Sequence, residues 1–193
     1  MMESETGPVD PVLRWHVDHS NFARLLDCLE VNTAAIACGE TPNYTLMIDI
    51  LTYLRRYPDR YHHPREDEAL SRLAARDPVA AAQVADLARA HGEMAAAGGQ
   101  LLEQLEEALG DVVFSRPALS SALAAYIGAY REHIRREESE IMPRAAALLT
   151  PSDWNAIAGA HASGPDPLFG DKFDARYRDL RNAIAIEGGE ASE

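Results

Sequence analysis

The sequence predicts an all-α protein, an up-down-up-down four-helix bundle with additional short C-terminal helices. Apolar residues recur at intervals of three and four along four long stretches, which is the spacing of amphipathic helices. The connections between these stretches are short and carry proline or glycine. No segment long enough to count as a strand alternates apolar with polar residues. Short connections place successive long helices antiparallel to one another.

The composition fits one acidic domain large enough to bury a core. The chain has 193 residues, with 18 Lys and Arg against 31 Asp and Glu, so its formal net charge is −13. A surface of this sign does not neutralise phosphates, and we expect binding neither to nucleic acid nor to a membrane. The N-terminal segment has no basic region followed by an apolar run, so we expect no signal peptide and a cytoplasmic location.

The first helix is predicted over residues 12–38, after a lead-in at residues 1–11. Gly39 follows it, a residue type suited to the end of a helix. His19 lies on the apolar face of this helix, among residues spaced by three and four. His16 lies on a more polar face, so we expect His19 to point inward and His16 to lie at the surface.

The second helix is predicted to begin after Pro42 and to extend to about Arg76. Pro58 and Pro64 lie inside this stretch. A proline in a helix interior removes one hydrogen bond and crowds the preceding turn, so we expect a kink or short break there. His62 continues the apolar face if the irregularity leaves the helical phase intact.

The third helix is predicted from Asp77-Pro78, a pair typical of helix starts, to Gly110. Gly98 and the glycine after it form a weak point inside the helix. Its apolar face runs through leucine, methionine and valine side chains, and His91 lies at its centre.

The fourth helix is predicted to open at Ser115 and to extend to about Leu149, with a second irregularity at Pro143. His133 and Glu137 lie on its apolar face, four residues apart and therefore one above the other.

The bundle itself would span residues 12–150, followed by a helical extension over residues 151–187. Pro151 is suited to the first position of a short helix. A last amphipathic piece is predicted over residues 171–186, and the tail at residues 188–193 is expected to be disordered. The apolar side chains of that last piece fall at helical spacing: Phe173, Tyr177, Leu180 and Ile184.

Two of the predicted helices repeat one design, a histidine followed four residues later by a glutamate. His62 pairs with Glu66 in this way, and His133 pairs with Glu137. A second acid follows each glutamate. The repetition suggests that two helices offer matched sets of ligands to one place.

Each of the four long helices therefore points one histidine at the core, and two of them add a glutamate. Buried carboxylates are costly unless they pair or bind a metal. Imidazole suits iron, zinc and copper, and carboxylates can bridge two cations, so we predict a two-metal site. A single structural zinc would use four of these groups and leave two unexplained. The six candidate ligands are His19, His62, Glu66, His91, His133 and Glu137.

Several neighbouring side chains have open roles. His63 would also bind if the irregularity rotates the helix, with Asp67 as its partner four residues on. Glu138 offers a second carboxylate beside the last candidate. Tyr126 and Tyr130 lie on the face of the last histidine, either as hydrogen-bond donors or radical traps near the site, or as core aromatics.

These motifs resemble the hemerythrin-like (HHE cation-binding) family over about residues 11–150. The residues that carry the likeness are the Trp-His-Val-Asp-His run ending at His19, the Tyr-His-His-Pro-Arg-Glu-Asp run that starts at Tyr61, His91, and the His-Ile-Arg-Arg-Glu-Glu run that starts at His133. The resemblance implies a four-helix bundle with a non-haem di-iron centre. Two iron ions would be bridged by carboxylates, with an open position for dioxygen or a related ligand. It also assigns the six candidates above as the metal ligands.

Two departures from the pattern of hemerythrins proper bear on function. Those proteins have a second histidine four residues after the one on the third helix, whereas this chain has Ala95. They also place the last carboxylate five residues after its histidine, whereas here Glu137 and Glu138 provide both spacings. The site is thus richer in carboxylate, which favours sensing, iron handling or oxidative chemistry over reversible oxygen carriage.

Three functions remain open at this point. The first is a di-iron protein that binds dioxygen, nitric oxide or iron for sensing, storage or stress response, as a monomer or homodimer. The second is a di-iron oxidoreductase that acts on peroxide or ferrous iron. The third is a structural or interaction bundle whose core histidines are hydrogen-bonded and free of metal. The first is the favoured hypothesis.

Overall fold

The computed structural model describes residues 11–110, 113–160, 164, 166–170 and 173–187, and all regular structure in these residues is helical. This confirms the all-α class. The predicted tail and all but the last residue of the predicted lead-in lie outside the described residues. None of the described helices is long and apolar enough to cross a membrane.

Eight α-helices are described, and shorter helical turns join some of them. The α-helices are α1 (Pro11–Ala37), α2 (Tyr44–Tyr57), α3 (His63–Arg76), α4 (Ala81–Leu109), α5 (Arg116–Arg136), α6 (Met142–Leu148), α7 (Pro151–Ala160) and α8 (Arg178–Glu187). The shorter elements are two π-helical turns and a 3₁₀ turn: η1 (Pro58–His62), η2 (Glu137–Ile141) and η3 (Ala175–Tyr177). The turn η1 joins α2 to α3 without a break, and η2 joins α5 to α6 in the same way. Each of these sets therefore forms one long irregular helix.

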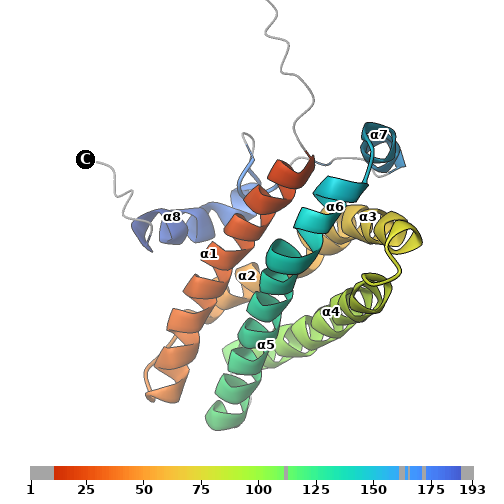
Figure 1. The fold of residues 1–193 in the computed structure, drawn as a ribbon. Coiled ribbons are helices and arrows are strands. Elements are labelled where there is room, and N and C mark those ends of the chain that lie inside the picture. The colour runs from red at the N-terminus through yellow and green to blue at the C-terminus, as the bar shows by residue number, and fades with distance from the viewer. Residues whose placement is uncertain (1–10, 111–112, 161–163, 165, 171–172, 188–193) are drawn as a thin grey trace, which may run out of the picture.

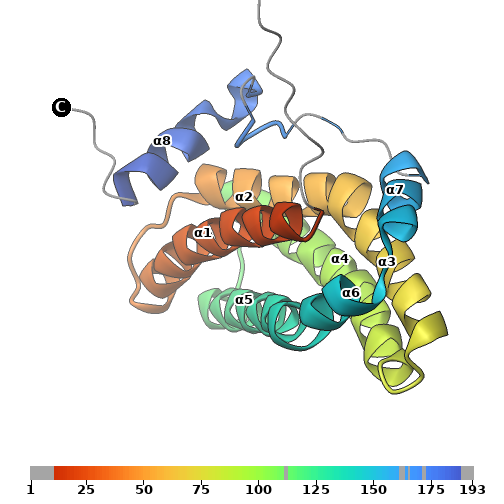
Figure 2. The ribbon, with the colours of Figure 1, turned by 45° about the horizontal axis from the view of Figure 1, so that its top comes forward.

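The long helices enclose one core. Helix α1 packs on α5 and α2, and α4 packs on α2 and α5, so each of the four contacts two of the others (Figure 1). The C-terminal elements lie outside this arrangement. Helix α8 packs against α1 and α2, and α7 packs against α3 near the other end (Figure 2).

Two apolar clusters fill the interior, one on either side of a band of polar side chains. On α1, His19 lies between Trp15, which belongs to one cluster, and Phe22, which belongs to the other. The order is reversed along the second long helix, where Tyr57 belongs to the cluster of Phe22 and Leu70, later in the chain, belongs to the cluster of Trp15. The predicted site therefore lies where the two clusters meet.

The helix ends follow the capping chemistry of the sequence. Gly39 has a φ of +81°, the left-handed conformation that glycine adopts without strain at the end of a helix. The side chains of Asn43 and Ser115 accept backbone N–H groups at the starts of α2 and α5. The predicted start of the third helix was early. Asp77 accepts backbone N–H groups of a short turn, and α4 begins only at Ala81.

The predicted irregularities are two π-helical turns, and each ends next to a proline. The N–H of His63 donates to the carbonyl of Pro58, five residues back, and that of Met142 donates to the carbonyl of Glu137. Pro64 follows the first turn and a second proline follows the other. Because a proline has no N–H and its ring crowds the carbonyl four residues back, the turn before it widens by one residue.

The wider turns change which residues face the core. A regular helical phase predicts that Leu148 is buried, but Leu148 is 42% exposed and Leu149 is buried instead. The extra residue in η2 shifts the phase of α6, and Leu149 follows the end of that helix in extended backbone. The last predicted helix also differs, because it starts later than expected. Phe173 precedes η3 and is exposed, whereas Tyr177, Leu180 and Ile184 are buried as predicted.

Candidate metal centre

Four buried imidazoles meet in two pairs at the junction of the apolar clusters. In the first pair, the Nε2 atoms of His19 on α1 and His62 in η1 lie 3.2 Å apart. In the second pair, the Nε2 atoms of His91 on α4 and His133 on α5 lie 3.0 Å apart. Four helices that are distant in sequence thus each contribute one ring nitrogen to the same small volume.

Two buried carboxylates lie between the pairs. Glu66 places Oε1 at 2.9 and 3.3 Å from the Nε2 atoms of the first pair, and Oε2 at 3.7 Å from Nε2 of His91. Glu137 places Oε2 at 3.3 Å from Nε2 of His19 and Oε1 at 3.1 Å from Nε2 of His133. Each carboxylate therefore turns one oxygen toward each pair. The structure brings all six predicted side chains together.

A second layer of acids holds the outer nitrogens of three of these rings, whereas Nδ1 of His133 is buried without a hydrogen-bond partner in the described structure. A carboxylate only accepts hydrogen bonds, so an Nδ1 that contacts one carries the proton, and Nε2 of the neutral ring is left with a bare lone pair. Acids beside histidine ligands commonly orient the ring in this way. The pairs are His19 with Glu138 at 2.8 Å, His62 with Asp18 at 3.1 Å, and His91 with Asp67 at 3.1 Å.

This layer answers two open questions from the sequence and adds one residue. Glu138 and Asp67 face the outer nitrogens of histidines and not the centre. Asp18 was missed, although it directly precedes His19 in the sequence. An acid directly before a candidate histidine is the sequence signal for it. His16 is exposed as predicted, and its Nδ1 lies 2.5 Å from the other oxygen of Glu138.

A fifth imidazole lies beside the second pair. His63 is only 6% exposed, and its ring stacks on that of His91 with 4.0 Å between ring centres. One ligand atom of His63 lies within 4.8 Å of ligand atoms of Glu66 and of both members of the second pair. Its Nδ1 is 3.0 Å from Asp59, four residues earlier, and not paired with Asp67 as the sequence suggested.

The charges of the centre compensate one another. Burial lowers the pKa of His19, but the carboxylates around its ring outweigh burial and hold that pKa well above its ordinary value. The same balance raises the pKa of His62, and raises the pKa of His91 to about 10. Burial raises the pKa of Glu66 and of Glu137, but the imidazoles outweigh it and hold both pKa values well below the usual range. Protons on the imidazoles thus balance the negative charge of the carboxylates, which a bound cation would otherwise balance.

The donor set fits metal cations. Among the described residues, Oε2 of Glu66 and both side-chain oxygens of Glu137 are buried without a hydrogen-bond donor. Such oxygens are costly unless something else binds them. Two donor atoms that bind one ion at about 2.1 Å, at right angles, lie about 3 Å apart. The contacts between Nε2 and carboxylate oxygens match this spacing in the first half, at 2.9 to 3.3 Å. In the second half, His133 lies 3.1 Å from Glu137, whereas His91 lies 3.7 Å from an oxygen of each glutamate.

Apolar and aromatic side chains separate the centre from water. Trp15, Leu70, Ile141 and Met142 line a narrow gap against the two carboxylates. On the opposite side lies Tyr130, which is buried and whose hydroxyl has no hydrogen-bond partner in the described structure. Burial raises its pKa well above the ordinary value, so the phenol stays protonated.

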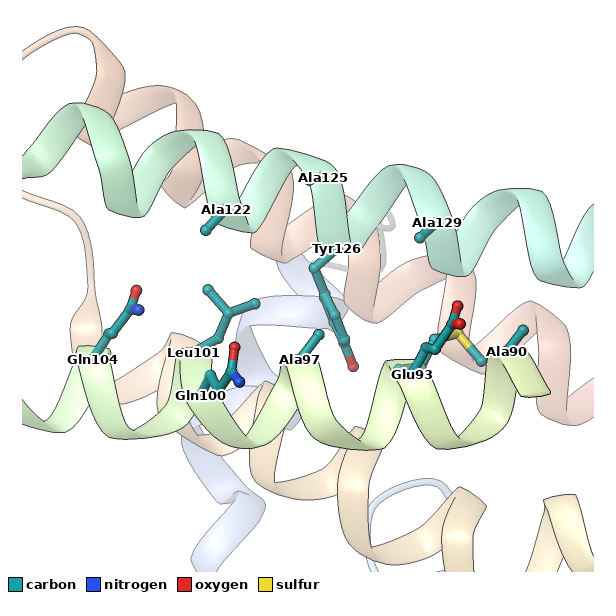
Figure 3. Close-up of a pocket in the computed structure, with 11 residues that line it drawn as sticks. Ala90, Glu93, Ala97, Gln100, Leu101, Gln104, Ala122, Ala125, Tyr126 and Ala129 are labelled. Atoms are coloured by element: carbon teal, nitrogen blue, oxygen red, sulfur yellow. The ribbon is translucent and has the colours of Figure 1, made fainter. Parts of the chain in front are cut away.

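A cavity of about 390 Å³ lies between α4 and α5, one helical turn from the second pair. Figure 3 shows alanines of α5 facing α4 across the gap, with Tyr126 reaching from one helix to the other. Ala90, directly before His91, and Ala129, four residues before His133, are the lining residues closest in sequence to the two histidines. The small side chains of both helices leave this space open.

Comparison with known protein families adds one finding. The family model for the hemerythrin HHE cation binding domain matches residues 10–145, well over half of the chain. This match confirms the resemblance that the motifs carry. No curated protein matches the sequence.

Proposed function

Because the chain belongs to the hemerythrin HHE cation-binding family, we propose that it is a non-haem di-iron protein that binds dioxygen, nitric oxide or iron. Its role would be sensing, storage or a stress response. The observation that carries this proposal is the placement of Glu66 and Glu137 between two imidazole pairs. Each carboxylate offers one oxygen to each pair, which is the geometry of a bridging ligand.

The same placement supports two ions over one. Each half of the cluster has two imidazole nitrogens and one oxygen from each glutamate, four donors in all. A single tetrahedral ion would be satisfied by one half and would leave the other pair of bare nitrogens facing each other. A set of nitrogen and oxygen donors without sulfur suits iron, and the family resemblance favours that metal.

The surrounding residues have defined roles in this proposal. A pair of irons supplies Lewis acidity and one-electron redox chemistry to a bound small ligand. The outer acids hold the Nδ1 protons and orient the rings, so the inner nitrogens are fixed in place. The apolar side chains around Trp15 exclude water from the carboxylates.

Metal analysis and spectroscopy of aerobically purified protein test the proposal. We expect about two irons per chain and near-ultraviolet absorption from an oxygen bridge between them. His62→Ala removes one member of the first pair and His133→Ala one member of the second, and each should lower the iron content. A folded, colourless protein that takes up no iron after anaerobic loading with ferrous iron would contradict it.

A second candidate function, a di-iron oxidoreductase acting on peroxide or ferrous iron, is favoured by Tyr130. A buried phenol whose hydroxyl has no partner in the protein could pass one electron and its proton to a peroxide at the centre, which would accept both. Tyr126 lies 5.8 Å away, between ring centres, and reaches the cavity between α4 and α5. If this function holds, Tyr130→Phe should slow peroxide consumption while the iron content stays unchanged. An unchanged rate would leave ligand binding as the function.

The proposal also covers the architecture. We take residues 12–150 as the up-down-up-down four-helix bundle and residues 151–187 as a helical extension. The family match ends at residue 145, and α7 and α8 pack outside the four long helices, which supports this division. A cytoplasmic location and a monomeric or homodimeric state remain predictions from the sequence.

A further inference from the structure

We infer that His63 is a fifth imidazole ligand of the centre and binds the ion held by His91 and His133. The inference rests on the proposed function, because it assigns one more ligand to the same centre. It concerns the one cluster member for which neither the helical pattern nor the family resemblance provides a role. Three features of the structure support it: the π turn, the position of the ring, and its outer acid.

The π turn explains how two consecutive histidines both reach the core. In a regular helix, neighbouring side chains point about 100° apart, so His62 and His63 would not share a face. Here η1 ends at His62 and α3 begins at His63, and both side chains are buried, at 2% and 6% exposure. Single π turns of this kind are frequently found at functional sites.

The ring position assigns His63 to the second pair. Its ring centre is 4.0 Å from that of His91, nearly parallel to it, and 6.3 Å from that of His133. Ligand atoms of these three histidines and of Glu66 all lie within 4.8 Å of one another. The corresponding group at the first pair contains only His19, His62 and Glu66 among the described residues.

The outer acid gives His63 the orientation of a ligand. Asp59 lies 3.0 Å from its Nδ1, just as Asp18, Asp67 and Glu138 contact the Nδ1 atoms of other histidines in the cluster. Because Nδ1 is committed to Asp59, Nε2 is the nitrogen that remains for a cation. The same contact between an acid and Nδ1 at His19, His62 and His91 groups His63 with the candidate ligands.

The consequence is an unequal pair of ions. The second pair, joined by His63, gives its ion three imidazoles, whereas the first pair gives two. The two glutamates are shared.

His63→Phe tests this inference, because phenylalanine keeps the stacked ring and removes both nitrogens. We expect the iron-loaded wild type to show two unequal doublets in its Mössbauer spectrum. In His63→Phe, one of these should shift or disappear, and one iron should be lost to a competing chelator at a concentration about 10- to 100-fold lower. Tyr61→Phe, a change on the same turn that alters no cluster nitrogen, is the matched control and should behave as wild type.

Asp59→Ala is the second variant, because the side chain of Asp59 is 37% exposed and its loss frees the outer nitrogen of His63 without changing the apolar core. It should weaken the same single iron, and this test stands even if His63→Phe does not fold. If the wild type binds two irons and both variants keep its chelator resistance and its spectra, the inference about His63 is wrong but the proposed function stands. A wild type that binds no iron pair would instead overturn the proposed function.

Discussion

His19 shows how the centre works at the scale of one residue. Its outer nitrogen contacts Glu138, and its inner nitrogen lies within 3.3 Å of His62, Glu66 and Glu137. In water, an imidazole has a pKa of about 6.5, so it is protonated below that pH and neutral above it. Here the neighbouring carboxylates raise its pKa, so a cation must displace a proton to bind.

Removal of one bridging carboxylate should uncouple the two ions. Glu66→Gln keeps the size of the side chain and removes its charge, so we expect loss of iron together with the stability that iron adds. That contribution is about 2.7 kcal/mol when the free metal is a hundred times its Kd. Thermal melts with and without iron measure it. Glu68→Gln, a change to a half-exposed acid on the same helix, is the control, and full iron binding by Glu66→Gln would refute the assignment of Glu66.

The metal-free protein should lose stability as the pH rises from about 6.5 to 10. The pKa values of His19, His62 and His91 are raised, so their stabilising effect is complete below the ordinary histidine pKa of 6.5 and is lost as the pH rises through the folded values, about 10 for His91. Melting temperatures of chelator-treated protein across this range measure the effect. Iron-loaded protein should lack the decline, because metal-bound imidazoles carry no proton on the bound nitrogen.

At the residue scale, helical spacing was enough to find the six side chains that converge. His19, His91 and His133 each lie on the apolar face of a regular helix, and a regular helix is what periodicity describes. The burial of His63 and the role of Asp59 depend on the π turn. Prolines in the sequence locate an irregularity but do not say which form it takes, so the role of His63 stayed open and Asp67 was suggested as its partner in place of Asp59.

At the scale of the element, the two long irregular helices are the informative feature. Their interruptions were predicted from Pro58, Pro64 and Pro143, and the structure shows how the chain absorbs them. Helix ends capped by Asn43 and Ser115 agree with the sequence because capping is a local interaction. The phase after η2 was wrong by one residue, because an added residue in a turn rotates everything that follows it.

Pro64→Ala should strengthen the helix and weaken the metal site. Alanine restores an N–H that can donate to the carbonyl of Arg60, and proline is about 3 kcal/mol less favourable than alanine inside a helix. The π turn should then relax to α and turn His62 and His63 away. Circular dichroism melts of metal-free protein and iron content measure the two effects. Pro117→Ala, in the first turn of α5 where proline is tolerated, is the control.

The outcome that would contradict this prediction is a Pro64→Ala protein with full iron content. The packing of the histidines themselves would then maintain the π turn, and Pro64 would not be needed for it.

At the scale of the whole molecule, the centre depends on contacts between distant segments. Periodicity predicted the helices, but it does not say that α4 packs on α2 and α5 with a cavity between α4 and α5. That arrangement follows from the volumes of many side chains together, including the alanines that line the gap. The sequence therefore predicted the class of fold and which side chains point toward the site. It did not predict the route by which a ligand reaches the site.

The cavity between α4 and α5 should be that route. Ala129→Phe places a large ring in it, and we expect azide to associate with iron-loaded protein about tenfold more slowly, an added barrier of ~1.4 kcal/mol. Dissociation should slow equally, so the affinity should stay unchanged. Stopped-flow absorption measures both rates. Ala124→Phe, on another face of the same helix, is the control. Equal rates in both variants would show that ligands arrive elsewhere.

The π turns also bear on how this chain is compared with its relatives. Such a turn is what a helix becomes when it gains one residue while both ends stay where they are. A relative without η1 would align correctly only if a gap were opened inside a helix, where alignments rarely place one. Without that gap, an alignment could place His63 opposite the residue of the relative that corresponds to His62. The roles of the two histidines would then be assigned the wrong way round. Insertions within helices are thus the place to look when the ligand counts of two members of the family disagree.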